Sequence, residues 1–317
     1  MQSSGNAFAD RFIGCLLGMA IGDAQGVAHA YRGGTETMSP ASLASYQPRL
    51  DADGSVEVPA GQFSLNMELA LCLLETLVTS DGFLDPELAI YRFDNAMRQT
   101  DLYLVDPREQ DAIKFAVDAE SFQSGGNSPS TGYPGPVTRA IPIAMVHSLS
   151  NLNIALVTRE IMRSVLLTDG DPEIVNGALA VAHAVRLVLR DDAPLEVVIS
   201  EVLSLIDEDN VARALRRGMP STSPEETGPV VSTAIHAAVE AGGDLEAAIA
   251  TTGDQGGAAH LTGSIAGAIC GAHTGARGIR PELVDGLEGR AYILMASPAL
   301  LRVAQMRSGL LFQLQIR

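Results

Sequence analysis

Aromatic residues are scarce in this chain. They make up 4% of its 317 residues, and tryptophan is absent. β-Sandwiches build their cores from aromatic and β-branched side chains, so the composition argues against that class. Hydrophobic residues account for 46%, which is typical of a globular chain rather than a disordered one. Abundant alanine and glycine favour closely packed helices.

Positive charge is scarce as well. The 21 Lys and Arg residues are outnumbered by 38 Asp and Glu residues, which gives a net charge of −17. Nucleic acids and anionic membranes are bound through Lys and Arg contacts, so neither is expected as a partner. A small anionic ligand would need a locally positive or helix-terminal site.

Cysteine is limited to Cys15, Cys72 and Cys270, which lie in apolar surroundings at no metal-like spacing. This pattern predicts buried thiols in a reducing compartment. The apolar run 12–21 follows no basic segment and is too short to cross a bilayer, so it predicts neither a signal peptide nor a membrane span. We therefore predict a cytoplasmic protein.

Hydrophobic periodicity predicts helices along most of the chain, separated by Gly, Pro and Asp. Two segments, 31–63 and 121–136, show no sustained period. With no internal repeat or polar linker, the chain is expected to form one all-α domain over residues 1–317. The expected helices are 8–21, 66–79, 86–97, 155–167, 172–190, 195–207, 229–241, 244–251, 262–272 and 292–306.

Four segments carry a resemblance to the ADP-ribosylglycohydrolase family, the relatives of dinitrogenase reductase-activating glycohydrolase. RFIGCLLGMAIGDAQG (11–26) resembles its opening helix R-x-x-G-x-L-L-G-x-A-x-G-D-x-x-G, and TDGDP (168–172) its T-H-x-D-P. RAIPI (139–143) resembles M-R-x-x-P-L, and TTGDQGGAAHLTGSIAGAICGA (251–272) resembles G-D-[ST]-D-[ST]-x-x-x-x-A-G-x-x-x-G-A. Their order and spacing agree, which implies a single-domain orthogonal helical bundle.

The resemblance also implies two Mg²⁺ ions that position a ribose and activate water to cleave ADP-ribosyl bonds. Magnesium prefers anionic oxygen ligands in octahedral geometry. The family's T-D-D-T motif falls on SLNM (64–67) and its D-[ST]-D-[ST] motif on AAHL (258–261), and neither segment holds a carboxylate. The histidine of T-H-x-D-P is Asp169 here. We therefore expect no metal cofactor and no magnesium-dependent hydrolysis.

What remains predicts a non-catalytic or strongly diverged member that recognises an ADP-ribose-like nucleotide or a protein partner in the former cleft. The loop 124–128 has the composition of a phosphate-binding nest, and Tyr133 is suited to stacking on a base. Arg139 is the expected partner of an anion, with a salt bridge to a carboxylate as its ordinary alternative. The predicted ligand-binding residues are Ser64, Asn66, Gly125, Gly126, Asn127, Ser128, Tyr133, Arg139, Gly257 and His260.

Two other hypotheses stay open. In the first, the chain is a metal-independent enzyme in which His260 acts as an acid/base with Asp23 or Asp169. In the second, it is a regulatory, antitoxin-like interaction module. The plain structural alternatives are helix capping by Asp23 and Asp169 and a hydrogen-bonded, structural His260.

Overall fold

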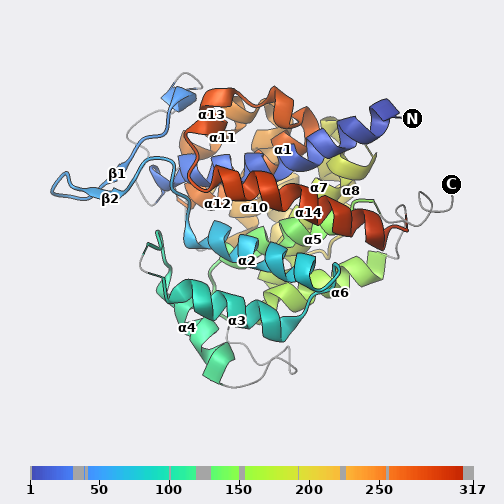
Figure 1. Cartoon of the computed structure of the whole chain (residues 1–317), viewed down its shortest axis with the longest axis horizontal. Helices are drawn as coiled ribbons and strands as arrows, with labels where there is room; N and C mark the ends of the chain where they lie inside the picture. The colour runs from blue at the N-terminus through green and yellow to red at the C-terminus, as the bar shows by residue number, and fades with distance from the viewer. Residues whose placement is uncertain are drawn as a thin grey trace.

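The computed structural model describes residues 2–30, 39, 42–99, 101–118, 130–149, 154–191, 193–221, 226–254 and 257–309. In this part of the chain, strand occurs only in the short antiparallel pair β1 (Arg49–Leu50) and β2 (Val56–Val58), which projects from the helical body (Figure 1). The α-helices described are α1 (Gln2–Val27), α2 (Leu65–Thr79), α3 (Pro86–Met97), α4 (Pro107–Asp118), α5 (Ala140–Val146), α6 (Ile154–Val165), α7 (Pro172–Asp191), α8 (Leu195–Leu203), α9 (Asn210–Arg217), α10 (Thr227–Glu240), α11 (Leu245–Asp254), α12 (Ala259–Thr274), α13 (Pro281–Asp285) and α14 (Arg290–Arg307). The all-α prediction is confirmed.

Several predicted boundaries are wrong. The first helix does not stop at Gly22 but continues to Val27, because Gly22 is a packing residue and not a C-cap. The helix expected at 195–207 ends at Leu203, and α9 follows as a separate helix. The side chain of Asp209 caps α9 by accepting a hydrogen bond from the backbone N–H of Ala212 at 3.1 Å. Helices α4, α5, α9 and α13 were not predicted.

The closest packing in the fold joins α1 to α12. Glycines repeat at every fourth residue of both helices: Gly14, Gly18 and Gly22 on α1, and Gly263, Gly267 and Gly271 on α12. A Cβ atom built on Gly18 would lie 2.1 Å from the carbonyl oxygen of Gly267, and the reverse substitution gives the same distance. The two backbones therefore touch directly, which explains the small-residue run of segment 251–272.

The other helices surround this pair. Helix α12 also packs on α7, α10 and α11, while α14 crosses α1, α2 and α5. Helix α2 in turn contacts α3, which packs on α4 at the lower edge of Figure 1. Helix α7 is long and apolar enough to cross a bilayer, but 83% of that stretch is buried in the protein, as in a core helix. The starts of α2, α7 and α12 thus bring the family-like motifs into one region.

Candidate functional site

Tyr133 lies between segments 64–67 and 258–261, the two segments on which the family's metal-binding motifs fall. The side-chain Nδ2 of Asn66, near the start of α2, donates a hydrogen bond of 2.6 Å to the Tyr133 hydroxyl. The same hydroxyl lies 3.4 Å from Nε2 of His260, near the start of α12. Tyr133 is only 1% exposed. Three of the predicted ligand-binding residues therefore come together, but they contact one another in the protein interior.

Asp23 and Ser64 form the neighbouring contact. Ser64 is the N-cap residue of α2, and its backbone N–H and hydroxyl donate to the two carboxylate oxygens of Asp23 at 2.6 and 2.8 Å. Burial raises the pKa of Asp23 to about 7, even though both hydrogen bonds favour the charged form. Asp23 thus supports the start of a helix through its cap residue, in line with the structural alternative considered for it.

Asp169 has a similar structural environment. Its carboxylate accepts hydrogen bonds from the hydroxyl of Thr131, from the backbone N–H of Thr131 at 3.1 Å and from the backbone N–H of Asp171 at 2.8 Å. Asp171 in turn accepts a hydrogen bond from the backbone N–H of Glu173 in the first turn of α7. These contacts fasten the segment before Tyr133 to the start of α7, and Thr131 was not predicted to take part.

Arg139 forms the salt bridge that was weighed against anion binding. Its guanidinium lies 3.4 Å from Glu109, and both side chains are about 1–2% exposed. It also donates to the Thr168 hydroxyl at 2.5 Å and stands over the Phe93 ring, 5.3 Å from its centroid. Burial raises the pKa of Glu109, and the charge of Arg139 opposes that rise. Glu109, on the unpredicted helix α4, completes this buried pair.

Arg108 covers one face of Tyr133, with its guanidinium carbon 5.2 Å from the ring centroid. Two hydrogen bonds of 3.0 and 2.8 Å hold that guanidinium against Asp106. Burial alone would raise the pKa of Asp106, but the bonds and charge of Arg108 lower it below its ordinary value. Stacking of a base on this face of Tyr133 would require Arg108 to move away.

His260 is fully buried and stays neutral at physiological pH. Burial, together with the positive charge of Arg49, lowers its pKa to about 3, although Asp106 acts in the opposite direction. The Asp23 carboxylate accepts hydrogen bonds from Ser64, and the Asp169 carboxylate accepts them from Thr131 and Asp171. These bonds join the two carboxylates to Ser64, Thr131 and Asp171, whereas His260 faces the hydroxyl of Tyr133.

The donor set at this place does not fit Mg²⁺. Within residues 64–67 and 258–261, five side chains are apolar, and the Ser64 hydroxyl is already engaged by Asp23. Asn66 keeps one buried amide oxygen without a hydrogen-bond partner in the described chain. No three His, Cys, Asp or Glu side chains among the described residues are placed to share a metal ion. An octahedral cation needs about six oxygen ligands, several of them anionic.

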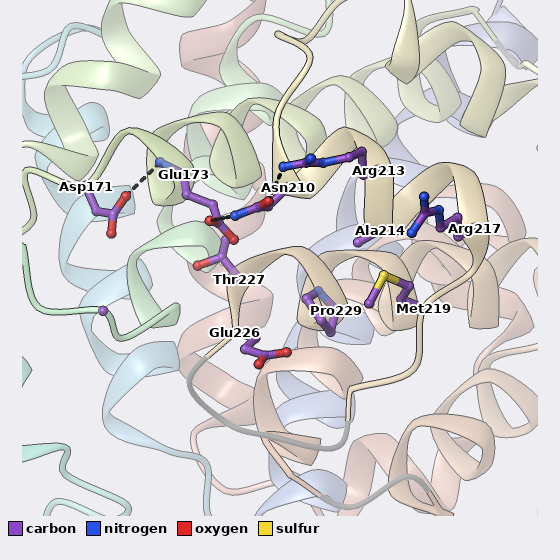
Figure 2. A pocket seen from close by; sticks show the side chains of 11 residues that line it. Asp171, Glu173, Asn210, Arg213, Ala214, Arg217, Met219, Glu226, Thr227 and Pro229 are labelled. Carbon is purple, nitrogen blue, oxygen red and sulfur yellow. Dashed lines mark hydrogen bonds between the residues drawn. The ribbon is translucent and has the colours of Figure 1, made fainter.

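A pocket of about 490 Å³ opens beside this buried network. It extends from the start of α7 to α9 and to the start of α10 (Figure 2). Figure 2 shows Arg213 and Arg217 along one side, with the acidic side chains at the opposite side and below. Its lining residues are Gly132, Asp171, Glu173, Asn210, Arg213, Ala214, Arg217, Met219, Glu226, Thr227 and Pro229.

Hydrogen bonds connect the walls of this pocket. Asn210 donates to Glu173 at 2.8 Å and accepts from Arg213. Gly132 precedes Tyr133 in the chain, so the pocket borders the network around that residue. Sequence reasoning missed this pocket because its arginines lie on α9, a helix of only eight residues.

Two other predicted ligand-binding elements are glycine-rich. Gly257 has a φ of 59°, a left-handed conformation that favours glycine, and it stands just before the N-cap of α12. Gly125, Gly126, Asn127 and Ser128 lie outside the described residues.

Comparison with known proteins decides the family. The family model described as ADP-ribosylglycohydrolase matches residues 4–309. The chain belongs to the ADP-ribosylglycohydrolase family. The resemblance drawn from the four sequence segments is therefore confirmed.

Two individual proteins are similar to this chain over most of its length. An uncharacterized protein of Archaeoglobus fulgidus is 27% identical over 305 residues, covering 90% of this chain and 93% of its own length. A solved structure named an ADP-ribosylglycohydrolase-related protein complex superposes with a TM-score of 0.76 at 21% identity. That alignment covers 94% of this chain and 99% of the other, and it establishes the fold.

Proposed function

We propose that this chain is a non-catalytic member of the ADP-ribosylglycohydrolase family that binds a nucleotide related to ADP-ribose and does not hydrolyse it. The observation that carries the proposal is the contact of Asn66 and His260 with the hydroxyl of Tyr133. Asn66 and His260 occupy positions that match the family's metal ligands, and all three residues are at least 98% buried. A tyrosine therefore stands where family-type hydrolysis would need cations.

The pocket along α9 is the proposed place of recognition. Its volume of about 490 Å³ is within the range of small-molecule sites. Arg213 and Arg217 supply guanidinium groups, which match phosphate geometry. The side chain of Arg217 makes no hydrogen bond or ion pair with the described residues, so its guanidinium donors are available to a diphosphate. On the opposite wall, Glu173 offers carboxylate acceptors for ribose hydroxyls.

Isothermal titration calorimetry with ADP-ribose, Mg²⁺ and both together tests the proposal. We expect ADP-ribose to bind equally well with and without Mg²⁺ and to be recovered unchanged. Arg217→Ala should weaken binding at least tenfold. Arg216→Ala is the matched control, because Arg216 is adjacent in sequence but pairs with Glu208 outside the pocket. Binding that requires Mg²⁺, or release of ADP-ribose from a modified protein, would refute the proposal.

The metal-independent enzyme remains a second candidate because one observation favours it. Asp23, with a pKa of about 7, would exchange a proton near neutral pH. Its partner in that hypothesis, His260, has a pKa of about 3 and is a weak base. If a glycoside or nucleoside substrate is turned over, His260→Ala should abolish turnover, and unchanged turnover in that variant would reject this candidate.

A further inference from the structure

A second pocket, of about 390 Å³, lies between α2, α3 and the start of α14. It shares no lining residue with the pocket along α9 and contains none of the residues matched to the metal motifs. Its walls combine carboxylates, side-chain amides and the rings of Phe63 and Tyr292. A ligand bound in this second pocket would therefore be independent of the proposed nucleotide.

The pocket contains two carboxylates, Glu68 and Glu75, both on α2 and next to α3. Glu75 on α2 is bound by the guanidinium of Arg92 on α3, and it also accepts a 2.6 Å hydrogen bond from the Tyr292 hydroxyl. Helix α2 packs on α3, and the pocket between them is lined by Glu68 and Glu75 from α2, by Arg92 and Asn95 from α3, and by Gln99, which follows the end of α3. Besides Arg92, which is bound to Glu75, this side of the pocket supplies the side-chain amides of Asn95 and Gln99.

Glu68 is a carboxylate without a counterion. It is half-buried, and its side chain makes no hydrogen bond or ion pair within the described part of the chain. Burial and the negative charge of Glu75 raise its pKa, as expected where no cation compensates. Because Arg92 already neutralises Glu75, the pocket as a whole carries one unbalanced negative charge. An anion would find no free cation there, because the guanidinium of Arg92 is bound to Glu75.

The other side chains that line the pocket indicate which kind of cation fits it. Asn95 and Gln99 present side-chain carbonyls that can accept hydrogen bonds, while Phe63 and Leu71 give apolar surface. Tyr292, which also lines the pocket, is 37% exposed, and an aromatic ring attracts a cation placed against its face. One free carboxylate is too few for a divalent ion, which favours several anionic oxygens.

We propose that this pocket binds an alkylammonium ion, with the ammonium group between Glu68 and Gln99 and the alkyl stem against Phe63 and Leu71. A free amine and the side chain of a lysine on another protein share this chemistry. Three ammonium protons match the carboxylate of Glu68 and the two amide carbonyls.

Saturation-transfer NMR and calorimetry with butylammonium and with Nα-acetyllysinamide test the proposal. We expect binding of butylammonium that Glu68→Gln weakens at least tenfold, while Glu196→Gln, an exposed glutamate on α8, changes nothing. Gln99→Lys should also abolish binding, because it supplies an ammonium group from the wall of the same pocket that holds Glu68. Binding of Nα-acetyllysinamide as well identifies a lysine side chain as the source, and binding of butylammonium alone identifies a free amine.

The controls separate the proposal from unspecific effects. Thermal melts of Glu68→Gln and Gln99→Lys should match wild type within a few degrees, so that lost binding is not lost folding. If neutral 1-pentanol binds as well as butylammonium, or if both variants retain wild-type affinity, the pocket does not recognise the ammonium group and the proposal is overturned.

Discussion

The side-chain amide of Asn66 donates a 2.6 Å hydrogen bond to the hydroxyl of Tyr133, and both residues are buried. A polar contact in the interior is costly to break from one side, because the remaining partner loses water without regaining a hydrogen bond. This contact therefore joins the start of α2 to the segment before α5 and holds that segment in place.

Tyr133→Phe should destabilise the protein by about 1–3 kcal/mol, because the buried Asn66 amide loses its acceptor. Urea unfolding followed by circular dichroism measures this change. The control is Tyr91→Phe on α3, whose ring is 67% exposed and which should stay within about 0.5 kcal/mol of wild type. Equal stabilities for the two variants would contradict the bridging role.

Arg139→Met should destabilise by about 3–5 kcal/mol, because it leaves Glu109 buried with no cation beside it. The same change at Arg216, whose partner Glu208 is solvent-exposed, should have no measurable effect on the urea midpoint. If the double variant Arg139→Met/Glu109→Leu regains most of the lost stability, the uncompensated charge is the cause. A double variant as unstable as Arg139→Met alone would point to lost packing instead.

Asp23→Asn should change how stability depends on pH. The folded-state pKa of Asp23 is about 7, above its ordinary value of 3.8, so between these values the folded protein holds a proton that the unfolded chain releases. Raising the pH through this window therefore destabilises wild type relative to the variant, by about 1.4 kcal/mol per pH unit. Unfolding free energies from pH 4.5 to 8 measure the difference, and a difference that is flat with pH would contradict the raised pKa.

His260→Gln should give the opposite slope. The folded-state pKa of His260 is about 3, below its ordinary value of 6.5, so the unfolded chain binds a proton that the folded protein does not. Wild type should therefore lose stability relative to the variant as the pH falls from about 6.5, at roughly 1.4 kcal/mol per pH unit. Unfolding free energies of the two proteins between pH 4 and 7 measure this trend, and a difference that stays constant with pH would contradict the lowered pKa of His260.

Gly18→Ala should destabilise by at least about 3 kcal/mol or prevent folding, because the new methyl would lie 2.1 Å from the carbonyl oxygen of Gly267. Gly242→Ala is an informative control: its φ is 59°, but nothing lies within 4 Å of the added atom. That change should cost only the conformational strain of about 1–2 kcal/mol. Thermal melts rank the two, and a smaller effect at Gly18 would contradict the direct backbone contact.

The sequence predicted the fold class because its signals are local and repeated. Proline at the first helical position marks the starts of the predicted helices 86–97 and 172–190, which are α3 and α7. Abundant alanine and glycine indicated close helix packing, as α1 and α12 show. The same Asp-Pro signal stands at 106–107, before α4, where charged neighbours obscure the apolar period. Short helices such as α9 were not predicted, because eight residues give barely two turns of hydrophobic periodicity.

The site was harder to predict because its contacts span the chain. The composition around Tyr133 suggested an exposed ligand-binding ring, yet the hydroxyl meets partners 67 and 127 residues away in sequence. No local pattern encodes such distances. Likewise, the chain has 38 acidic residues, and only the packing of α4 decides that Glu109 is the one that pairs with Arg139.

The contact between α1 and α12 also has a consequence during synthesis. Helix α1 ends at Val27, whereas its partner begins at residue 259. At ribosomal rates of about 5–20 residues per second, the glycine-lined face of α1 waits roughly 10–50 s for its partner to emerge. During that interval the face of α1 that packs on α12 has no native cover, so the nascent chain should depend on chaperones until translation is nearly finished.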